Sequence, residues 1–214
     1  TNFHIDILQP VVEAAAEICG RKYEPDSDDG RRLRRITDHV RACTFAIHED
    51  VEPGTKKQSY VIRRLLRRAI LDGHQMGLTE PFLYQLVGAV IEQMTAPYPD
   101  LPSTQRRVEE EIREEEKTFL GTIDEGVARI ERVFNDMESG QRMMVSGNEA
   151  ADLYTTYGVP PELFQQLANE RKFTFDWDGY RTAMEQHGQV SGGGRGELFK
   201  TGAIESIKSA IQRT

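Results

Sequence analysis

The sequence has few of the residues that build disulfide frameworks, and it lacks the long apolar runs of membrane spans. Only two of its 214 residues are cysteines, and no secretory pattern accompanies them, which argues against a disulfide-stapled fold. We interpret Cys19 and Cys43 as buried structural thiols. No apolar segment approaches the roughly 20 residues of a membrane-spanning helix, and no signal peptide is recognisable. We therefore expect a soluble, cytoplasmic protein.

Histidine is also scarce, and the motifs that build active sites are missing. The five histidines are His4, His39, His48, His74 and His187. None of them pairs with a histidine or cysteine at the spacing of metal ligands, and no nucleophile with a base forms a catalytic pattern. We therefore expect neither catalytic residues nor a metal site in this chain. His39, beside an apolar stripe, is interpreted as structural.

Acidic side chains outnumber basic ones by 35 to 27, giving a net charge of -8. Such a balance normally argues against a nucleic-acid partner. The charge is unevenly distributed, because residues 31–75 hold eleven basic and five acidic side chains, a local balance of +6 that leaves -14 elsewhere. Charges farther away than about 10 Å are screened at moderate salt, so the local field decides what is attracted. One end of the molecule can therefore attract phosphate groups.

Apolar residues recur every three or four positions along most of the chain, which indicates amphipathic helices. We expect a mostly all-α fold, a helical bundle with one long helix and short loops. The expected helices cover residues 6–19, 33–48, 60–74, 79–94, 103–137, 146–154, 160–168 and 176–184. Thr79 is a candidate N-cap, and Ser146 with Glu149 has the spacing of a capping box. Residues 172–175 are compatible with a small extended segment.

Two stretches resemble ligand sites only superficially. The glutamates of residues 109–116 could be imagined as a divalent-metal site, but Arg113 and Lys117 offer partners along the helix. We interpret this acidic cluster as a solvated face of the long helix. The glycine run in residues 188–196 follows no strand and lacks the Lys-Ser/Thr pair, so we interpret it as a flexible linker rather than a phosphate loop.

The most informative element is a basic strip, with six positive charges in thirteen residues and no acid among them. Its residues are Lys56, Lys57, Tyr60, Arg63, Arg64, Arg67 and Arg68. Arginines four positions apart share one side of a helix, so the strip can follow a phosphate backbone. It is equally compatible with an ordinary amphipathic helix whose arginines pair with the acidic long helix. The charge pattern alone leaves both interpretations open.

Five stretches, taken together, suggest a family. They are TNFHIDIL at 1–8, RITDHVRACTF at 35–45, SYVIRRLLRRA at 59–69, EEEKTF at 114–119 and LYTTYGVP at 153–160. In order and spacing they closely resemble alanyl-tRNA synthetases over about residues 1–187. The second and third stretches resemble the family's tRNA-recognition region. So many independent matches make chance similarity improbable.

The resemblance implies a helical module that grips the tRNA acceptor stem, within an enzyme that joins alanine to tRNA at the expense of ATP. The class II catalytic domain, with ATP and Mg²⁺, would precede Thr1, and a zinc-binding editing domain would follow Thr214. The chain itself would need no cofactor and would be inactive alone. We expect residues 1–25 to be a segment following the catalytic domain and residues 26–140 to be the helical tRNA-recognition bundle. Residues 141–187 would form a smaller helical subdomain, and residues 188–214 a flexible linker with the start of a helix leading to the editing domain.

Two positions depart from the family pattern. Thr55 stands where the family has an asparagine, and Thr155 where it has an aspartate; both family residues are associated with reading a G·U pair in the acceptor stem. A hydroxyl can donate and accept one hydrogen bond, so base contact by either threonine is retained as a hypothesis. With the basic strip they complete the expected tRNA-binding set. The alternatives are a surface role for Thr155, and for the whole chain a protein-interaction scaffold that binds no RNA.

Overall fold

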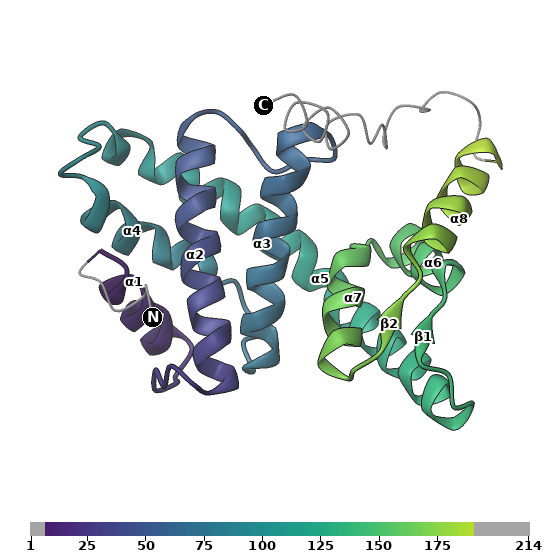
Figure 1. The fold of residues 1–214 in the computed structure, drawn as a ribbon. Coiled ribbons are helices and arrows are strands. Elements are labelled where there is room, and N and C mark those ends of the chain that lie inside the picture. Colours follow the sequence, from purple (N-terminus) through teal and green to yellow (C-terminus); the bar gives the residue numbers. More distant parts are fainter. Residues whose placement is uncertain (1–6, 191–214) are drawn as a thin grey trace, which may run out of the picture.

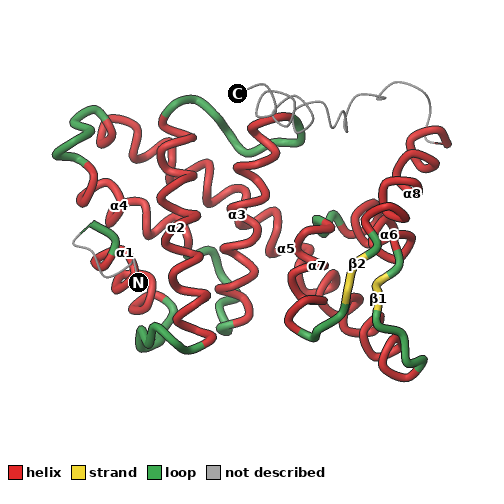
Figure 2. The backbone as a smooth tube through the Cα atoms, viewed as in Figure 1, coloured by secondary structure: helices red, strands yellow, loops and turns green. Residues whose placement is uncertain are grey.

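The computed structural model describes residues 7–190, which form eight α-helices, two 3₁₀ turns and two very short strands (Figure 1). The helices are α1 (Gln9–Ile18), α2 (Asp28–His48), α3 (Lys57–Gln75), α4 (Val87–Met94), α5 (Gln105–Ser139), α6 (Gly147–Tyr157), α7 (Pro161–Glu170) and α8 (Trp177–Val190). The 3₁₀ turns are η2 (Leu83–Leu86) and η3 (Leu101–Thr104), and the strands are β1 (Met144–Val145) and β2 (Thr174–Phe175). The predicted mostly all-α fold with one long helix is confirmed (Figure 2).

The first group of helices contains α1 to α4 and packs around the pair α2 and α3, which lie side by side (Figure 1). The predicted stripe of α2 is fully buried at Leu33, Ile36, Val40, Cys43 and Ile47. Both cysteines are buried free thiols, as predicted, and burial is the main cause that raises the pKa of Cys19 to about 11. A continuous apolar core therefore fixes α2 against its neighbours.

The second group contains α6 to α8 and a parallel pairing of β1 with β2. An aromatic cluster anchors it to the C-terminal half of α5, with the ring of Phe134 5.6 Å from Phe164 and 5.4 Å from Phe173. The 35-residue α5, about 50 Å long, therefore contributes to both groups. Strand β2 confirms the extended segment expected near residues 172–175.

Local capping signals behave as the sequence predicts in the second group. The backbone N–H of Glu149 donates to Ser146 Oγ at 3.2 Å, and the Ser146 N–H donates to Glu149 Oε2 at 3.0 Å, which completes the capping box. Gly158 ends α6 in the left-handed region with a φ of 65°. Such a turn favours glycine because a Cβ is disfavoured there.

The predicted N-cap at Thr79 is wrong, because no helix begins there and α4 starts only at Val87. The carboxylate of Glu116, in α5, instead accepts hydrogen bonds from the backbone N–H groups of three consecutive residues. These are Phe82 at 3.1 Å, Leu83 at 2.9 Å and Tyr84 at 3.2 Å. A side chain more than 30 residues away therefore caps the turn η2, and Thr79 has no capping role.

The same bonds correct the interpretation of the acidic cluster as wholly solvated. Glu116 is fully buried, and its burial raises the pKa of the carboxyl group to about 7. The side chain of Glu115 is only 10% exposed and contacts arginines of α3. Glu110 and Glu114 do lie on the solvent side. The cluster is therefore divided between solvent and two buried structural contacts.

The described part ends within the predicted linker. Residues 188–190 belong to α8, whereas 191–214, with the rest of the linker, and 1–6, with His4, lie outside the described residues. Among residues 7–190 no helix combines the length and the apolar character that crossing a bilayer requires. The domain divisions at 25, 140 and 187 stay predictions.

Candidate nucleic-acid interface

The loop before α3 presents three of the predicted site residues to solvent. Thr55, Lys56 and Lys57 are all exposed, and neither lysine forms an ion pair with any residue in the described range 7–190. The loop is closed by a hydrogen bond from the Gly54 N–H to the Ser59 carbonyl oxygen at 2.9 Å. The N-terminus of a helix carries positive potential, which the two lysines reinforce. The loop therefore carries a positive local potential on an exposed surface.

Arg67 occupies a very different environment, between the two groups of helices. Its side chain is 7% exposed, and its guanidinium lies over the ring of Phe119, 4.8 Å from the centroid. Its Nε donates to Glu115 Oε1 at 2.6 Å, and its Nη1 donates to the carbonyl oxygen of Gly158 at 2.9 Å. Burial lowers the pKa of Arg67, against the opposing effect of Glu115. Arg67 therefore joins α3, α5 and the end of α6, and it has little surface left for a ligand.

Arg63 lies one turn earlier and shares the carboxylate of Glu115, with its Nε 3.2 Å from Oε1. Of the two interpretations of the basic strip, pairing with the long helix is thus confirmed for Arg63 and Arg67. Arg63 is 26% exposed, so its guanidinium remains partly accessible from solvent.

A second contact between the groups centres on Glu162 at the start of α7. The hydroxyl of Tyr60 donates to Glu162 Oε2 at 3.3 Å, and Arg64 Nη1 lies 3.4 Å from Oε1. Burial, followed by the charge of Glu162, raises the pKa of Tyr60, so its hydroxyl keeps its proton. Arg64 is 39% exposed and therefore combines this contact with access to solvent.

Thr155 is exposed near the C-terminal end of α6. Its hydroxyl donates to the carbonyl oxygen of Ala151 at 2.8 Å, within its own helix. The oxygen can still accept a hydrogen bond from outside. Arg67 binds Gly158 three residues later, so α3 is tied to the helix end that carries Thr155.

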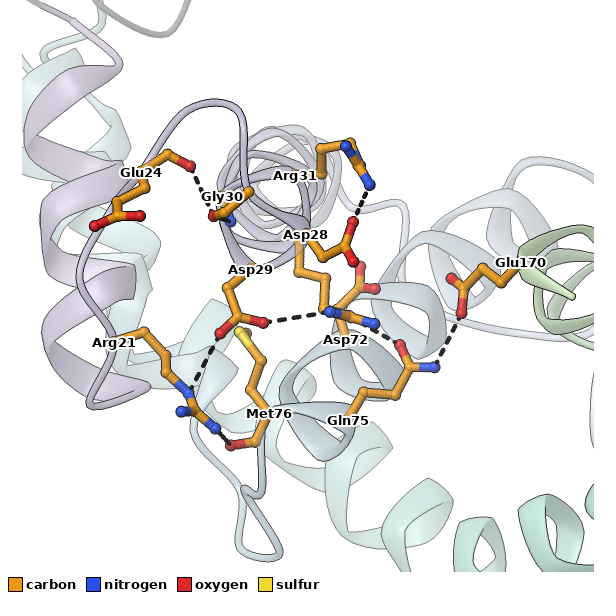
Figure 3. A network of polar contacts seen from close by, with 12 residues as sticks. Arg21, Glu24, Asp28, Asp29, Gly30, Arg31, Asp72, Gln75, Met76 and Glu170 are labelled. Atoms are coloured by element: carbon orange, nitrogen blue, oxygen red, sulfur yellow. Dashed lines mark hydrogen bonds and ion pairs between the residues drawn. The ribbon is translucent and has the colours of Figure 1, made fainter.

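Three arginines that the predicted site omitted lie on α2 and face a cleft of about 800 Å³ between α2, α3 and α7. They are Arg31, Arg32 and Arg35, and the predicted residues Arg64 and Arg68 line the same cleft. Next to it, the Gln75 amide donates to Glu170 of α7 at 3.5 Å and accepts from Arg32 Nε at 3.2 Å (Figure 3). The +6 balance of residues 31–75 was the sequence signal that could have found these arginines.

The described residues offer no arrangement typical of a metal centre. No group of three His, Cys, Asp or Glu side chains within residues 7–190 converges in a way that could hold an ion. His39 is buried, with Nδ1 3.1 Å from the carbonyl oxygen of Leu65, which agrees with a structural role. Burial and the charge of Arg68 lower the pKa of His39 to about 4, so it is neutral at physiological pH.

Comparison with known proteins identifies the family of this chain. The family model described as tRNA synthetases class II (A) matches residues 1–210. An alanine–tRNA ligase of Rhodopirellula baltica is 59% identical over 214 residues, which is all of this chain and 23% of the relative. An alanine–tRNA ligase of Streptococcus mutans is 35% identical over 204 residues, covering 95% of the chain and 23% of the relative. The chain thus spans about a quarter of the length of the curated relatives it matches. With nearly every residue matched, the chain belongs to the alanyl-tRNA synthetase family of class II tRNA synthetases.

Proposed function

We propose that this chain is the part of an alanine–tRNA ligase that binds the acceptor stem of alanine-specific tRNA and presents its 3′ end to a catalytic domain. The observation that carries the proposal is the exposed loop of Thr55, Lys56 and Lys57, whose two cations have no ion-pair partner in the described structure. Unpaired cations at a helix N-terminus suit phosphate oxygens. Because the chain belongs to a family of tRNA synthetases, we take RNA as the source of those phosphates.

The contacts between the two groups of helices support a composite RNA surface. Arg67 ties α3 to the end of α6, and Glu162 receives Tyr60 and Arg64 from α3. These contacts fix the helix that carries Thr155 relative to the helix that follows Thr55. In this arrangement phosphate contacts from the lysines position the stem, and the two threonine hydroxyls lie on the surface available for base edges. A hydroxyl oxygen that accepts can bind the guanine amino group, which the minor groove presents as a donor.

The remaining parts of the proposed enzyme lie outside these residues. On the family resemblance alone, we assign ATP and Mg²⁺ to the catalytic domain and Zn²⁺ to the editing domain. Those two domains would be the chain's intramolecular partners, in the cytoplasm. The described helices contribute binding and orientation, and we expect no aminoacylation by this chain alone.

A titration with RNA tests the proposal. A fluorescent acceptor-stem duplex with a G·U pair is added to the chain at low and moderate salt, next to a duplex with G·C in its place. We expect binding that weakens steeply as salt rises, and a preference for G·U that falls in Thr155→Val. The double variant Lys56→Gln/Lys57→Gln should bind more weakly, while Arg106→Gln, a change of an exposed pair on α5, should not. Absence of binding at low salt would refute the proposal.

The second candidate function, a protein-interaction scaffold without RNA binding, is favoured by one observation. Three of the four arginines of α3 have carboxylate partners inside the molecule: Arg63, Arg64 and Arg67. A strip neutralised in this way attracts phosphates less than the sequence suggests. No binding of the duplex at low salt, together with salt-insensitive binding of a protein partner, would support the scaffold.

A further inference from the structure

The cleft between α2, α3 and α7 has an unusual lining. Five arginines face it, together with five polar or acidic side chains of α7. The α7 residues are Glu162, Gln165, Gln166, Asn169 and Glu170. With Asp28, the acids of the lining number three against five arginines.

Four of the five arginines are compensated by carboxylates. The pairs are Arg31 with Asp28, Arg32 with Asp29, Arg35 with Asp72 and Arg64 with Glu162. Arg68 is the exception, because it forms no ion pair with any residue of the described range. Burial and the charges of Arg35 and Arg64 lower the pKa of Arg68, against the opposing effects of Asp72 and Glu170. An uncompensated guanidinium therefore stands beside other guanidinium groups.

Two polar atoms on the cleft are buried and have no hydrogen-bond partner in the part of the chain described. They are Nε of Arg68 and Oε1 of Gln166. Buried polar groups in folded proteins are almost always hydrogen-bonded, so Nε of Arg68 needs an acceptor and Oε1 of Gln166 needs a donor such as water. The partner that suits a guanidinium donor best is an anionic oxygen, and phosphate oxygens match its geometry.

We propose that this cleft binds a phosphate group, with Arg68 as its principal donor. Arg64, which is partly exposed, adds a second donor, and the charged pair of Arg35 with Asp72 holds the wall in place. The phosphate can come from an RNA backbone or from free phosphate, and the chemistry of recognition is the same. Binding of an RNA phosphate in the cleft rests on the proposed function, whereas binding of free phosphate does not.

The test uses two ligands and matched variants of the 214-residue chain. Inorganic phosphate and the acceptor-stem duplex are titrated separately into the unchanged chain, Arg68→Gln, Arg68→Lys and Arg106→Gln. Arg106 is 91% exposed on α5, pairs with Glu110 and is not part of the lining of the cleft, so its variant removes the same charge elsewhere on the molecule. We expect Arg68→Gln to raise the dissociation constant about tenfold for the ligand that occupies the cleft, with Arg68→Lys intermediate. Arg106→Gln should leave it unchanged.

A measurement on the unchanged chain covers the case in which Arg68→Gln does not fold. The NMR resonance of the Arg68 Nε–H group should shift saturably as the occupying ligand is added. Loss of RNA affinity in Arg68→Gln assigns the cleft to the RNA backbone, and loss of phosphate affinity alone assigns it to free phosphate. If neither ligand depends on Arg68 and its resonance does not move, the cleft proposal is overturned. If the cleft proposal is overturned but the chain still binds RNA in a salt-sensitive way, the proposed function stands. If the chain binds phosphate through Arg68 but binds no RNA, the cleft proposal stands and the proposed function is refuted.

Discussion

Replacing Arg67 by methionine removes the guanidinium that joins the two groups of helices while keeping an unbranched apolar stem. Three contacts are lost: the 2.6 Å bond to Glu115, the 2.9 Å bond to the Gly158 carbonyl and the stacking on Phe119. Breaking a buried ion pair by removing one partner costs about 3–5 kcal/mol. Because Arg63 still lies 3.2 Å from the same carboxylate, we expect the low end of that range, about 3 kcal/mol.

Urea unfolding followed by circular dichroism measures this loss. Arg63→Met is the first control, because Arg63 is 26% exposed and makes a single bond of its own to Glu115, and the change should cost about 1 kcal/mol. Arg106→Met, at a position 91% exposed, should change the free energy of unfolding by no more than about 0.5 kcal/mol. Adding Glu115→Gln to Arg67→Met should cost less than the sum of the two single changes, since it removes the uncompensated charge. An Arg67→Met chain as stable as Arg106→Met would refute the structural role assigned to Arg67.

Two further predictions concern α5. The pKa of Glu116 in the folded chain, about 7, is higher than its ordinary 4.5, so the folded state binds the extra proton and stability should fall as pH rises between these values. The contribution of Glu116 to the slope of the free energy of unfolding against pH should reach about 1.4 kcal/mol per pH unit, and it should disappear in Glu116→Gln. Equal pH dependence of the urea midpoints of the two chains would contradict this. Gly126→Ala places a Cβ 2.4 Å from Val159 Cγ2 and should cost about 1–3 kcal/mol, partly restored by Val159→Ala. Gly121→Ala, whose Cβ would meet no atom within 4 Å beyond the adjoining residues and backbone of its own helix, should instead stabilise α5 by about 0.5–1 kcal/mol. Equal effects of the two alanines in thermal melts would refute this packing.

The features that the sequence predicted well depend on residues close together in the chain. The stripe from Leu33 to Ile47 recurs every three or four positions, and the capping box joins residues three positions apart, so both follow from helix geometry. The two-residue strand β1 escaped prediction because it is too short to show alternation and gains its partner only from β2, 30 residues later. The turn η2 escaped because its cap, Glu116, comes from another helix.

For the candidate site too, the sequence predicted what depends on residues close together in the chain and missed what depends on distant partners. The sequence identified the exposed lysines and the arginines of α3, because their six charges fall within thirteen residues of the chain. It could not distinguish Arg67, which is buried against Glu115, from Arg68, which is not paired within the described residues. That difference arises from the packing of α5 against α3, which buries Arg67 and leaves Arg68 on the cleft. The arginines of α2 joined the cleft only through the same packing.

The most direct test of the central claim is a map of where RNA touches the chain. A photo-reactive side chain is placed at Thr55, at Thr155 or, as a control, at the exposed Ser103 of η3, and each chain is irradiated with the acceptor-stem duplex. We predict crosslinks to the stem from positions 55 and 155, lost at high salt, and none from position 103. Binding of the duplex that gives no crosslink from either threonine, or equal crosslinking from Ser103, would contradict it.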